Sequence, residues 1–334
     1  MNGGPTTVSV IVPAYQRPEA LERCLRALAR QTRRADEVVV VLRVGDDATI
    51  AAAARVASEP STRLRLESVT TPGVVAAMQR GLDVASGEII ALTDDDAEPR
   101  ADWLERLVAT LQRDDRIVGA GGRDWQSLER GDASDVGRVQ WFGRVIGNHH
   151  LGAGPARDVD LLKGVNCAFR AAPLRSVGFD ARLLGGGAQL HWELALCLPL
   201  RRAGWRLVYD PAIAVDHHVA VRSGDDQFHR GRFAVEPFTQ AVHNETLVLL
   251  AHQQGMARLA YRIWSVLIGT TANPGALAAL RLRLQGHSWA ADAWRAARDG
   301  RARAHATWAA TDQRVPLAAP ASAAGAAGPS RSDR

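Results

Sequence analysis

The chain has 334 residues, of which 46% are hydrophobic and 23% are charged, and its formal net charge is +5. This composition excludes a disordered chain and provides enough apolar material for one large domain with an appendage, or for two domains. The cysteines Cys24, Cys167 and Cys197 stand far apart in apolar surroundings without CxxC spacing, which argues for reduced thiols and against a thiolate metal site.

Strands and helices are predicted to alternate through the first third of the chain. Apolar, β-branched runs predict strands at residues 8–15, 36–42, 64–69 and 87–96. Apolar residues at helical spacing predict the intervening helices at 19–31, 48–57 and 74–85. The alternation predicts an α/β fold, in which a doubly wound, mostly parallel sheet carries helices on both faces.

The pattern then becomes less regular. Glycine-rich stretches at 118–125 and 183–194 are suited to loops that approach a ligand closely. A predicted helix at 192–204 and a short strand at 205–211 follow, and after them comes the pair His217 and His218. From about residue 227 the apolar spacing predicts a C-terminal helical extension.

Three consecutive aspartates, Asp94, Asp95 and Asp96, are the last residues of the fourth predicted strand. Adjacent carboxylates repel one another unless they are solvated or share a cation, and hard divalent ions such as Mg²⁺ and Mn²⁺ prefer oxygen ligands. The alternative is a solvated acidic turn before the next helix. Ligands of doubly wound sheets bind outside the carboxyl ends of the strands, so the position of the triplet favours a site for a metal and a diphosphate.

Four segments, at residues 8–31, 81–107, 163–180 and 191–218, together resemble the nucleotide-sugar-dependent family 2 glycosyltransferases of the GT-A fold. The resemblance extends over roughly residues 7–219, with the segments in the family's order. It implies an inverting transfer of a sugar from a nucleotide-diphosphate sugar to an acceptor hydroxyl, in the biosynthesis of a polysaccharide, a glycolipid or another glycoconjugate.

The resemblance implies a metal site at the aspartates. The family's DxD motif falls on the triplet, with Asp96 as the metal ligand and Asp94 and Asp95 on the donor side. His217 matches a histidine that completes the metal site in many relatives, and the alternative is a core or surface histidine beside His218. The implied cofactor is Mg²⁺ or Mn²⁺.

The donor's base is expected against the loop after the first strand. By resemblance this loop contributes Pro13, Tyr15 and Arg17. The family usually has an Asp pair directly after its second strand, but this chain has Leu and Arg at 42–43. Either a slightly longer loop returns Asp46 or Asp47, a few residues later, to the base, or base recognition differs. Asp46 is assigned to the donor site on the first of these expectations.

The family's catalytic base matches Glu193, at the start of the predicted helix. The alternative is a surface glutamate in the first turn of a helix, where acidic residues are favoured. As a general base, Glu193 would take the proton from the attacking acceptor hydroxyl. Trp192 beside it and Asn166 are expected to contact the acceptor.

The resemblance and the composition together predict three parts. Residues 1–225 form the catalytic domain, with a nucleotide-sugar half at about 1–120 and an acceptor half at about 121–225. Residues 226–310 form a C-terminal helical region. The Ala-, Pro- and Ser-rich residues 311–334 are expected to be disordered.

The expected partners are the nucleotide-sugar donor and a carbohydrate or lipid-linked acceptor. The most apolar helix, at 259–269, is interrupted by Arg262 and is too short to span a bilayer. Its tryptophan and arginine neighbours suit either an anionic membrane surface or packing on the catalytic domain or another subunit. No secretory signal is visible, so the expected location is the cytoplasm. If the helix lies on an anionic membrane surface, the protein is expected to contact the cytoplasmic face of the membrane peripherally.

Two other functions were weighed. A metal-dependent nucleotidyltransferase would also use acidic strand ends, but it predicts a basic, glycine-rich loop near the N-terminus, which the sequence around Pro13 does not provide. A non-catalytic nucleic-acid-binding protein predicts a basic stripe with exposed aromatics. The arginines here are dispersed, so no nucleic-acid partner is expected.

Overall fold

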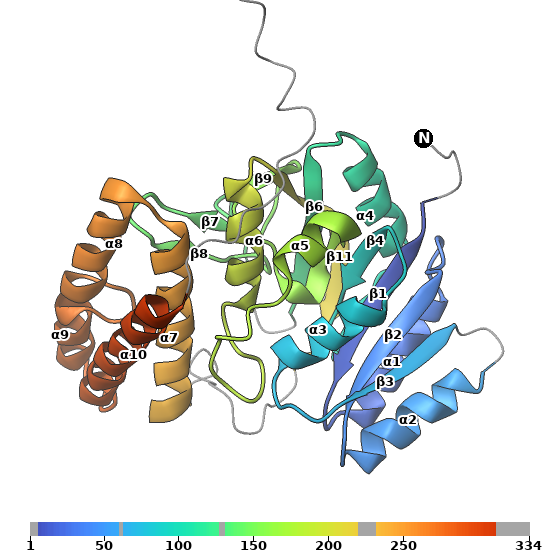
Figure 1. The fold of residues 1–334 in the computed structure, drawn as a ribbon, viewed down its shortest axis with the longest axis horizontal. Coiled ribbons are helices and arrows are strands. Elements are labelled where there is room, and N and C mark those ends of the chain that lie inside the picture. Colours follow the sequence, from blue (N-terminus) through green and yellow to red (C-terminus); the bar gives the residue numbers. More distant parts are fainter. Residues whose placement is uncertain (1–5, 60–62, 127–130, 220–231, 312–334) are drawn as a thin grey trace, which may run out of the picture.

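The computed structural model describes residues 6–59, 63–126, 131–219 and 232–311. The first part of the chain alternates as predicted (Figure 1), with the elements β1 Val8–Ala14, α1 Pro18–Ala29, β2 Glu37–Arg43, α2 Asp47–Ala57, β3 Leu64–Val69, α3 Val74–Val84, β4 Ile89–Leu92, β5 Ala97–Pro99 and α4 Trp103–Gln112.

The middle of the chain completes the sheet, and the last part is helical. The middle elements are β6 Ile117–Trp125, β7 Arg138–Val139, β8 Val145–Ile146, β9 Arg157–Val159, the 3-10 turn η1 Gly164–Asn166, β10 Cys167–Arg170, α5 Ala171–Val177, α6 Trp192–Arg202 and β11 Arg206–His217. The C-terminal helices are α7 Val235–His252, α8 Gly255–Leu267, α9 Ala276–Leu284 and α10 Ala290–Ala310.

Within the described residues the main sheet has nine strands, in the order β3-β2-β1-β4-β10-β6-β11-β5, with β9 also paired to β11. The strands β3, β2, β1 and β4 are parallel to one another, which confirms the predicted parallel arrangement. β10 is antiparallel to both β4 and β6, and β6 is parallel to β11. The carboxyl ends of β4, β6 and β11 therefore lie at the same edge.

Each face of the sheet has its own hydrophobic core. One core packs α3, α5 and α6 against the sheet, and the other packs α1, α2 and α4 against the opposite face. The strands β1 and β2 are buried on both sides, which explains why they are nearly continuous apolar runs in the sequence. Helices on both faces are thus confirmed.

The C-terminal helices lie beside the sheet (Figure 1), and α7 packs against α6. Residues 247–250 of α7 and Tyr261 of α8 belong to the same core as α3 and α6. The helical region is therefore joined to the sheet by a shared core. Among the described residues, no helix is long and apolar enough to cross a bilayer. The tail expected to be disordered lies, from residue 312 onwards, outside the described residues.

One expectation about the middle of the chain is wrong. The glycine-rich residues 118–125 form most of β6 and are buried except for the last, whereas the sequence analysis expected a loop. A Cβ atom on Gly122 would lie 2.0 Å from the Ile213 carbonyl oxygen, and one on Gly119 would lie 2.7 Å from the Leu207 side chain. These glycines are needed because neighbouring strands approach β6 closely.

Candidate active site

The three aspartates lie directly after β4, at the carboxyl end of a fully buried strand. Asp95 and Asp96 are each 3% exposed, and Asp94 is half-buried. Just before them, the Thr93 hydroxyl donates to the Val165 carbonyl at 3.0 Å, which ties the triplet to η1. Buried carboxylates need compensating charges, and the structure provides Arg17 beside Asp95 and Asp96 and His217 beside Asp96.

Asp94, Asp96 and His217 bring three potential ligand atoms within 4.8 Å of one another. The antiparallel register of β5 and β11 pairs His217 with Ala97, the residue after Asp96. As a result, His217 Nε2 lies 3.3 Å from Asp96 Oδ1. Carboxylate oxygens suit Mg²⁺ and Mn²⁺, and imidazole nitrogen is a common metal ligand.

His218, by contrast, points away from this cluster. Its side chain is 52% exposed and lies 3.1 Å from Glu98. Of the two histidines that the sequence analysis left unseparated, only His217 faces the aspartates.

A fourth carboxylate, Asp124 of β6, lies behind His217. Asp124 is fully buried, lies 3.3 Å from His217 Nδ1, and accepts a 2.6 Å hydrogen bond from the Lys163 ammonium. Lys163 is the only lysine of the chain. A carboxylate on one ring nitrogen directs the other nitrogen towards a metal, so Asp124 orients His217 Nε2 towards Asp96.

The charges around His217 control its protonation. Burial alone would lower the pKa of His217, but its contacts with Asp124 and Asp96 raise that pKa to about 9. Burial alone would raise the pKa of Asp124, but Lys163 and His217 hold it well below its ordinary value. Without metal the imidazole is protonated at neutral pH, and a bound cation would take the place of that proton. The donor set and its supporting carboxylate fit a divalent cation.

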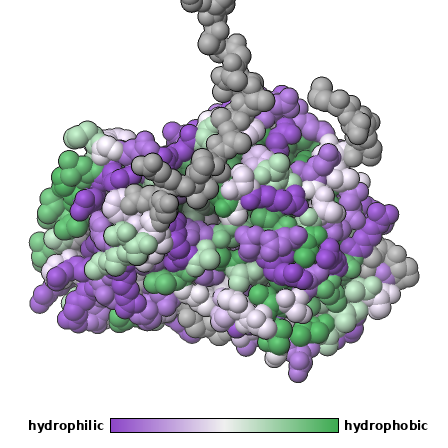
Figure 2. Space-filling model, viewed as in Figure 1, coloured by the Kyte–Doolittle hydropathy of each residue, from purple (hydrophilic) through white to green (hydrophobic). Residues whose placement is uncertain are grey.

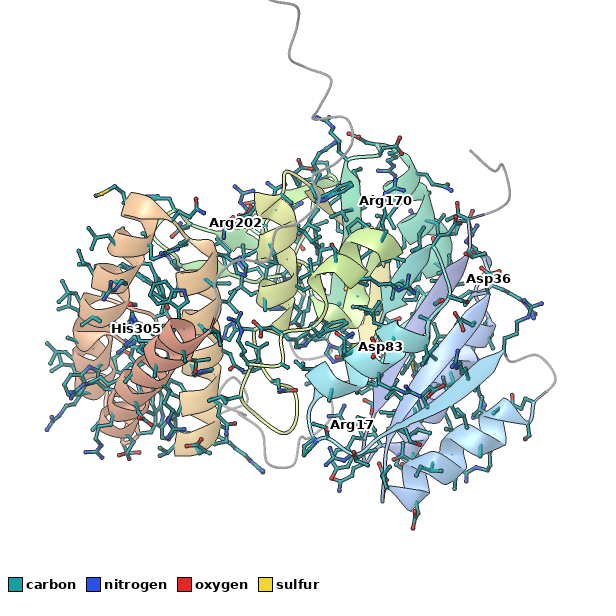
Figure 3. All side chains as sticks on the ribbon, viewed as in Figure 1. Arg17, Asp36, Asp83, Arg170, Arg202 and His305 are labelled. Atoms are coloured by element: carbon teal, nitrogen blue, oxygen red, sulfur yellow. The ribbon has the colours of Figure 1, made fainter. Side chains whose placement is uncertain are left out.

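Asp95 contacts the loop after β1. Arg17 Nη1 lies 2.7 Å from Asp95 Oδ1 and 3.1 Å from Asp96 Oδ2, and the Tyr15 backbone N–H donates to Asp95 at 3.1 Å. Burial raises the pKa of Asp95 to about 7, against the lowering effect of Arg17. Figure 3 shows Arg17 at the lower edge of the sheet. Asp95 therefore supports the position of the Tyr15–Arg17 loop.

Asp46 supports the same loop from the other side. Its carboxylate accepts from the Gln16 backbone N–H at 2.5 Å and from the Thr49 N–H at 3.3 Å, so it caps α2 and holds the loop. Pro13 lies within β1, and Tyr15 is 49% exposed. The structure thus brings the sequence-predicted donor residues to one end of β1 and β2, beside the aspartates.

Glu193 lies in the first turn of α6 and is half-buried. Its Oε1 accepts from the Gly164 backbone N–H of η1 at 3.3 Å. Burial raises the pKa of the Glu193 carboxyl above its ordinary value, and the charge of Asp94 acts in the same direction. A carboxylate with a raised pKa is a stronger proton acceptor, as a general base requires.

The two residues expected to contact an acceptor differ in their surroundings. Trp192 is 6% exposed, and a Cβ on Gly164 would lie 2.1 Å from its ring, so it packs directly beneath η1. Asn166 is fully buried: its side chain accepts from Trp103 Nε1 and donates to the carbonyls of Arg123 and Ile213, at 2.8, 3.0 and 3.0 Å. This contradicts an acceptor contact for Asn166, which instead joins η1 to the sheet.

The glycine-rich loop before Glu193 is held by the C-terminal helices. Asn244 of α7 accepts from the Leu184 N–H at 2.8 Å and donates to the carbonyls of Leu184 and Leu190 at 3.0 and 3.1 Å. Within the loop, Gln189 accepts from the Val75 N–H at 2.9 Å and so caps α3. The loop therefore has defined contacts on both sides.

Sequence reasoning missed Asp124 and Asn244. Asp124 had a signal, because it follows a glycine-rich stretch that ends a strand at the same edge as the triplet. The single lysine of the chain was a second signal for a special contact. Asn244 had none, because its partners lie about 60 positions earlier in the chain and only the tertiary fold reveals them.

Comparisons with known proteins bear on the family and the fold. A family model described as Glycosyl transferase family 2 matches residues 9–175, which include the aspartate triplet but neither Glu193 nor His217. The chain is 30% identical over 188 residues to glycosyltransferase AglE of Haloferax volcanii, a match that covers 55% of this chain and 59% of AglE. The chain thus spans less than two thirds of the length of the curated relatives it matches.

Solved structures share the fold. TarS 1–349 of S. aureus, in complex with UDP-GlcNAc, aligns with a TM-score of 0.56 at 17% identity, covering 90% of this chain and 92% of that chain. The mannosyltransferase PcManGT of Pyrobaculum calidifontis, in complex with GDP-Man and Mn²⁺, aligns with a TM-score of 0.53 at 20% identity. The alignment covers 92% of this chain and 88% of that chain. The predicted GT-A fold with a C-terminal helical part is therefore confirmed.

Proposed function

Because the chain belongs to glycosyl transferase family 2, we propose that it transfers a sugar from a nucleoside-diphosphate sugar to a hydroxyl group of an acceptor. One observation carries the proposal: Asp94, Asp96 and His217 form a cluster of potential ligands within 4.8 Å. Close by, the Glu193 carboxyl is near enough to Asp94 for that charge to raise its pKa. The site thus offers a place for a cation beside a proton acceptor.

Asp94, Asp96 and His217 would hold Mg²⁺ or Mn²⁺. When bound, such a cation supplies positive charge to the donor diphosphate and stabilises the charge that develops on it as the leaving group. The structurally similar PcManGT is in complex with Mn²⁺, which supports this choice of cofactor. Asp124 would keep His217 Nε2 directed at the cation.

The nucleoside would lie against the loop after β1. Tyr15 offers an exposed ring, Pro13 lies near the end of β1, and Asp46 holds the loop at Gln16. Arg17 supplies a positive charge near the diphosphate, while Asp95 acts through Arg17 and the loop. UDP-GlcNAc in TarS and GDP-Man in PcManGT are donors of the class we propose.

The chemistry would proceed as a single inverting displacement. The acceptor oxygen bonds to the anomeric carbon while the bond from that carbon to the diphosphate oxygen breaks, and the nucleoside diphosphate leaves. Glu193 takes the proton from the acceptor hydroxyl. The Gly164 N–H that binds Glu193 Oε1 fixes the carboxylate, and burial keeps its pKa raised, so it accepts this proton readily.

The acceptor would be a carbohydrate or a lipid-linked sugar, in the synthesis of a polysaccharide, a glycolipid or another glycoconjugate. Trp192, next to Glu193, is the residue that we assign to the acceptor. Residues 1–120 would bind the donor and residues 121–225 the acceptor, while residues 226–310 support the loop before Glu193. The three cysteines are free and buried, which supports a cytoplasmic location. The family match favours neither nucleotidyl transfer nor nucleic-acid binding.

A thermal-shift screen tests this proposal. UDP, GDP, dTDP and CDP are each added with and without Mn²⁺, since a ligand that binds the native state raises the melting temperature. We expect one nucleoside diphosphate to stabilise the protein only when metal is present. If no nucleotide shifts the folded protein under either condition, the donor site is wrong.

Two variants separate the proposed roles. Asp96→Asn should remove the metal-dependent stabilisation. Glu193→Gln should keep that stabilisation while donor turnover falls by about 10²- to 10⁴-fold. Glu105→Gln, an exposed carboxylate on α4, is the control and should change neither. Equal loss of nucleotide binding in the first two variants would contradict the assignment.

A further inference from the structure

One side of the C-terminal helices is apolar and exposed. We call it the apolar face, and its residues are Met256, Leu259, Ile263, Val266 and Leu267 of α8 and Leu277, Leu280 and Leu284 of α9. Each of these side chains is between 48% and 80% exposed. At about 100° per residue, the five positions on α8 span about 100° of the helix circumference and the three on α9 span about 60°, so each helix presents a continuous stripe.

The apolar face is not used to fold the chain. α8 packs inwards through Tyr261 and Ser265, which are 0% and 2% exposed, and α9 packs through Ala278 and Leu282 at 8% and 2%. α8 and α9 also contact each other, so their stripes adjoin. Figure 2 shows hydrophobic atoms at the outer left edge of this part of the molecule.

The charge around the apolar face has one sign. Residues 246–291 contain four arginines and not one aspartate or glutamate. Arg262, Arg281 and Arg283 are exposed, and at helical spacing they lie at the borders of the two stripes. An apolar stripe with arginines at its borders is the pattern of a helix that lies in the interface of an anionic membrane.

We propose that the apolar face docks the protein on an anionic bilayer surface, with the leucine and isoleucine side chains in the interface and the arginines on lipid phosphates. A second copy of the chain fits less well, because these helices would bring the same arginines and no carboxylate to the contact. Residues 312–334 have only Val315 and Leu317 as large apolar side chains, which is too little for this segment to cover the face. This surface is separate from the residues of the proposed reaction.

Vesicle co-sedimentation of the full chain tests the proposal, without nucleotide or added metal, so that its outcome does not depend on glycosyl transfer. The probes are vesicles of phosphatidylcholine alone and vesicles with 30% phosphatidylglycerol, at low and high salt. We expect binding to the anionic vesicles that weakens with salt. Leu259→Gln with Ile263→Gln should lower binding by about tenfold or more per residue. Arg262→Gln with Arg283→Gln should lower it about fivefold per arginine.

Matched controls come from the sheet side of the molecule. Leu66→Gln, on the edge strand β3 and 38% exposed, and Arg34→Gln, also exposed, should bind vesicles as the parent chain does. Unchanged melting temperatures show that the variants are folded. Failure of the folded parent to bind anionic vesicles overturns the proposal. So does a concentration-dependent dimer that the Leu259→Gln, Ile263→Gln variant abolishes, because a second copy then covers the face.

Discussion

The protonation of His217 makes the stability of the metal-free protein depend on pH. His217 is 6% exposed, and Asp124 and Asp96 raise its pKa from 6.5 to about 9. A group whose pKa is higher in the native state than in the unfolded state stabilises the fold while it is protonated. This contribution is complete below about pH 6.5 and is lost as the pH rises through about 9.

The size of this stability loss follows from the release of one proton, that of His217. Within the window the free energy of unfolding falls by about 1.4 kcal/mol per pH unit. Between pH 7 and pH 8.5 the metal-free protein should therefore lose about 2 kcal/mol of stability. His217→Gln removes the titrating group and should remove most of this loss. Saturating Mg²⁺ should stabilise the parent protein more at pH 8.5 than at pH 7. At the higher pH a smaller fraction of His217 carries the proton that the cation has to displace.

Urea unfolding in EDTA, followed by tryptophan fluorescence at pH 7, 7.5, 8 and 8.5, measures this effect. The parent protein and His217→Gln are compared at each pH, and the parent is then repeated in Mg²⁺. A flat stability profile in the parent protein, or the same slope in His217→Gln, would refute the contact of His217 with two carboxylates.

Three further substitutions test the surroundings of the site. Asp124→Asn should weaken Mn²⁺ binding by about 10- to 100-fold, because His217 loses the carboxylate that orients it; calorimetric titration measures this. Asn166→Ala should lower stability by about 3 kcal/mol, since it leaves three buried groups unpaired, and an unchanged urea midpoint would contradict its structural role. Asn244→Leu should release the loop before Glu193, which proteolysis at that loop detects, and should lower kcat for donor turnover more than it changes KM for the donor.

The alternating first part of the fold follows from local pattern. β1 and β2 are buried on both faces, and such strands appear in a sequence as continuous apolar runs. The same pattern placed the aspartate triplet at the carboxyl end of the fourth strand, although the predicted strand included the aspartates and β4 ends earlier, at Leu92. The position of the candidate site was thus available from the sequence.

The strand β6 shows where local pattern fails. Its glycines Gly119, Gly121 and Gly122 favour a loop by propensity, yet all three are buried in a strand. The cause is the path of β11, which shifts register between Tyr209 and Ala214 and places the Ile213 carbonyl against Gly122. A single sequence does not contain this close approach, so the loop prediction was wrong.

The details of the site depend on contacts between distant segments. The sequence could not separate His217 from His218, because neighbouring residues on a strand differ only in the face they occupy. The pairing of β11 with β5 decides between them, by placing His217 beside Ala97. In the same way, Asn244 reaches the loop before Glu193 only because α7 packs on α6.

The charges at the site explain why a chain of positive net charge concentrates carboxylates there. The aspartates Asp94, Asp95, Asp96 and Asp124 face two permanent cations, Arg17 and Lys163, and one proton on His217 partly offsets the remaining negative charge. A divalent cation in place of that proton would bring one more positive charge to the group than the proton does. Burial makes uncompensated charge costly, so the arrangement favours the metal-bound form and ties the affinity for the metal to the protonation of a single histidine.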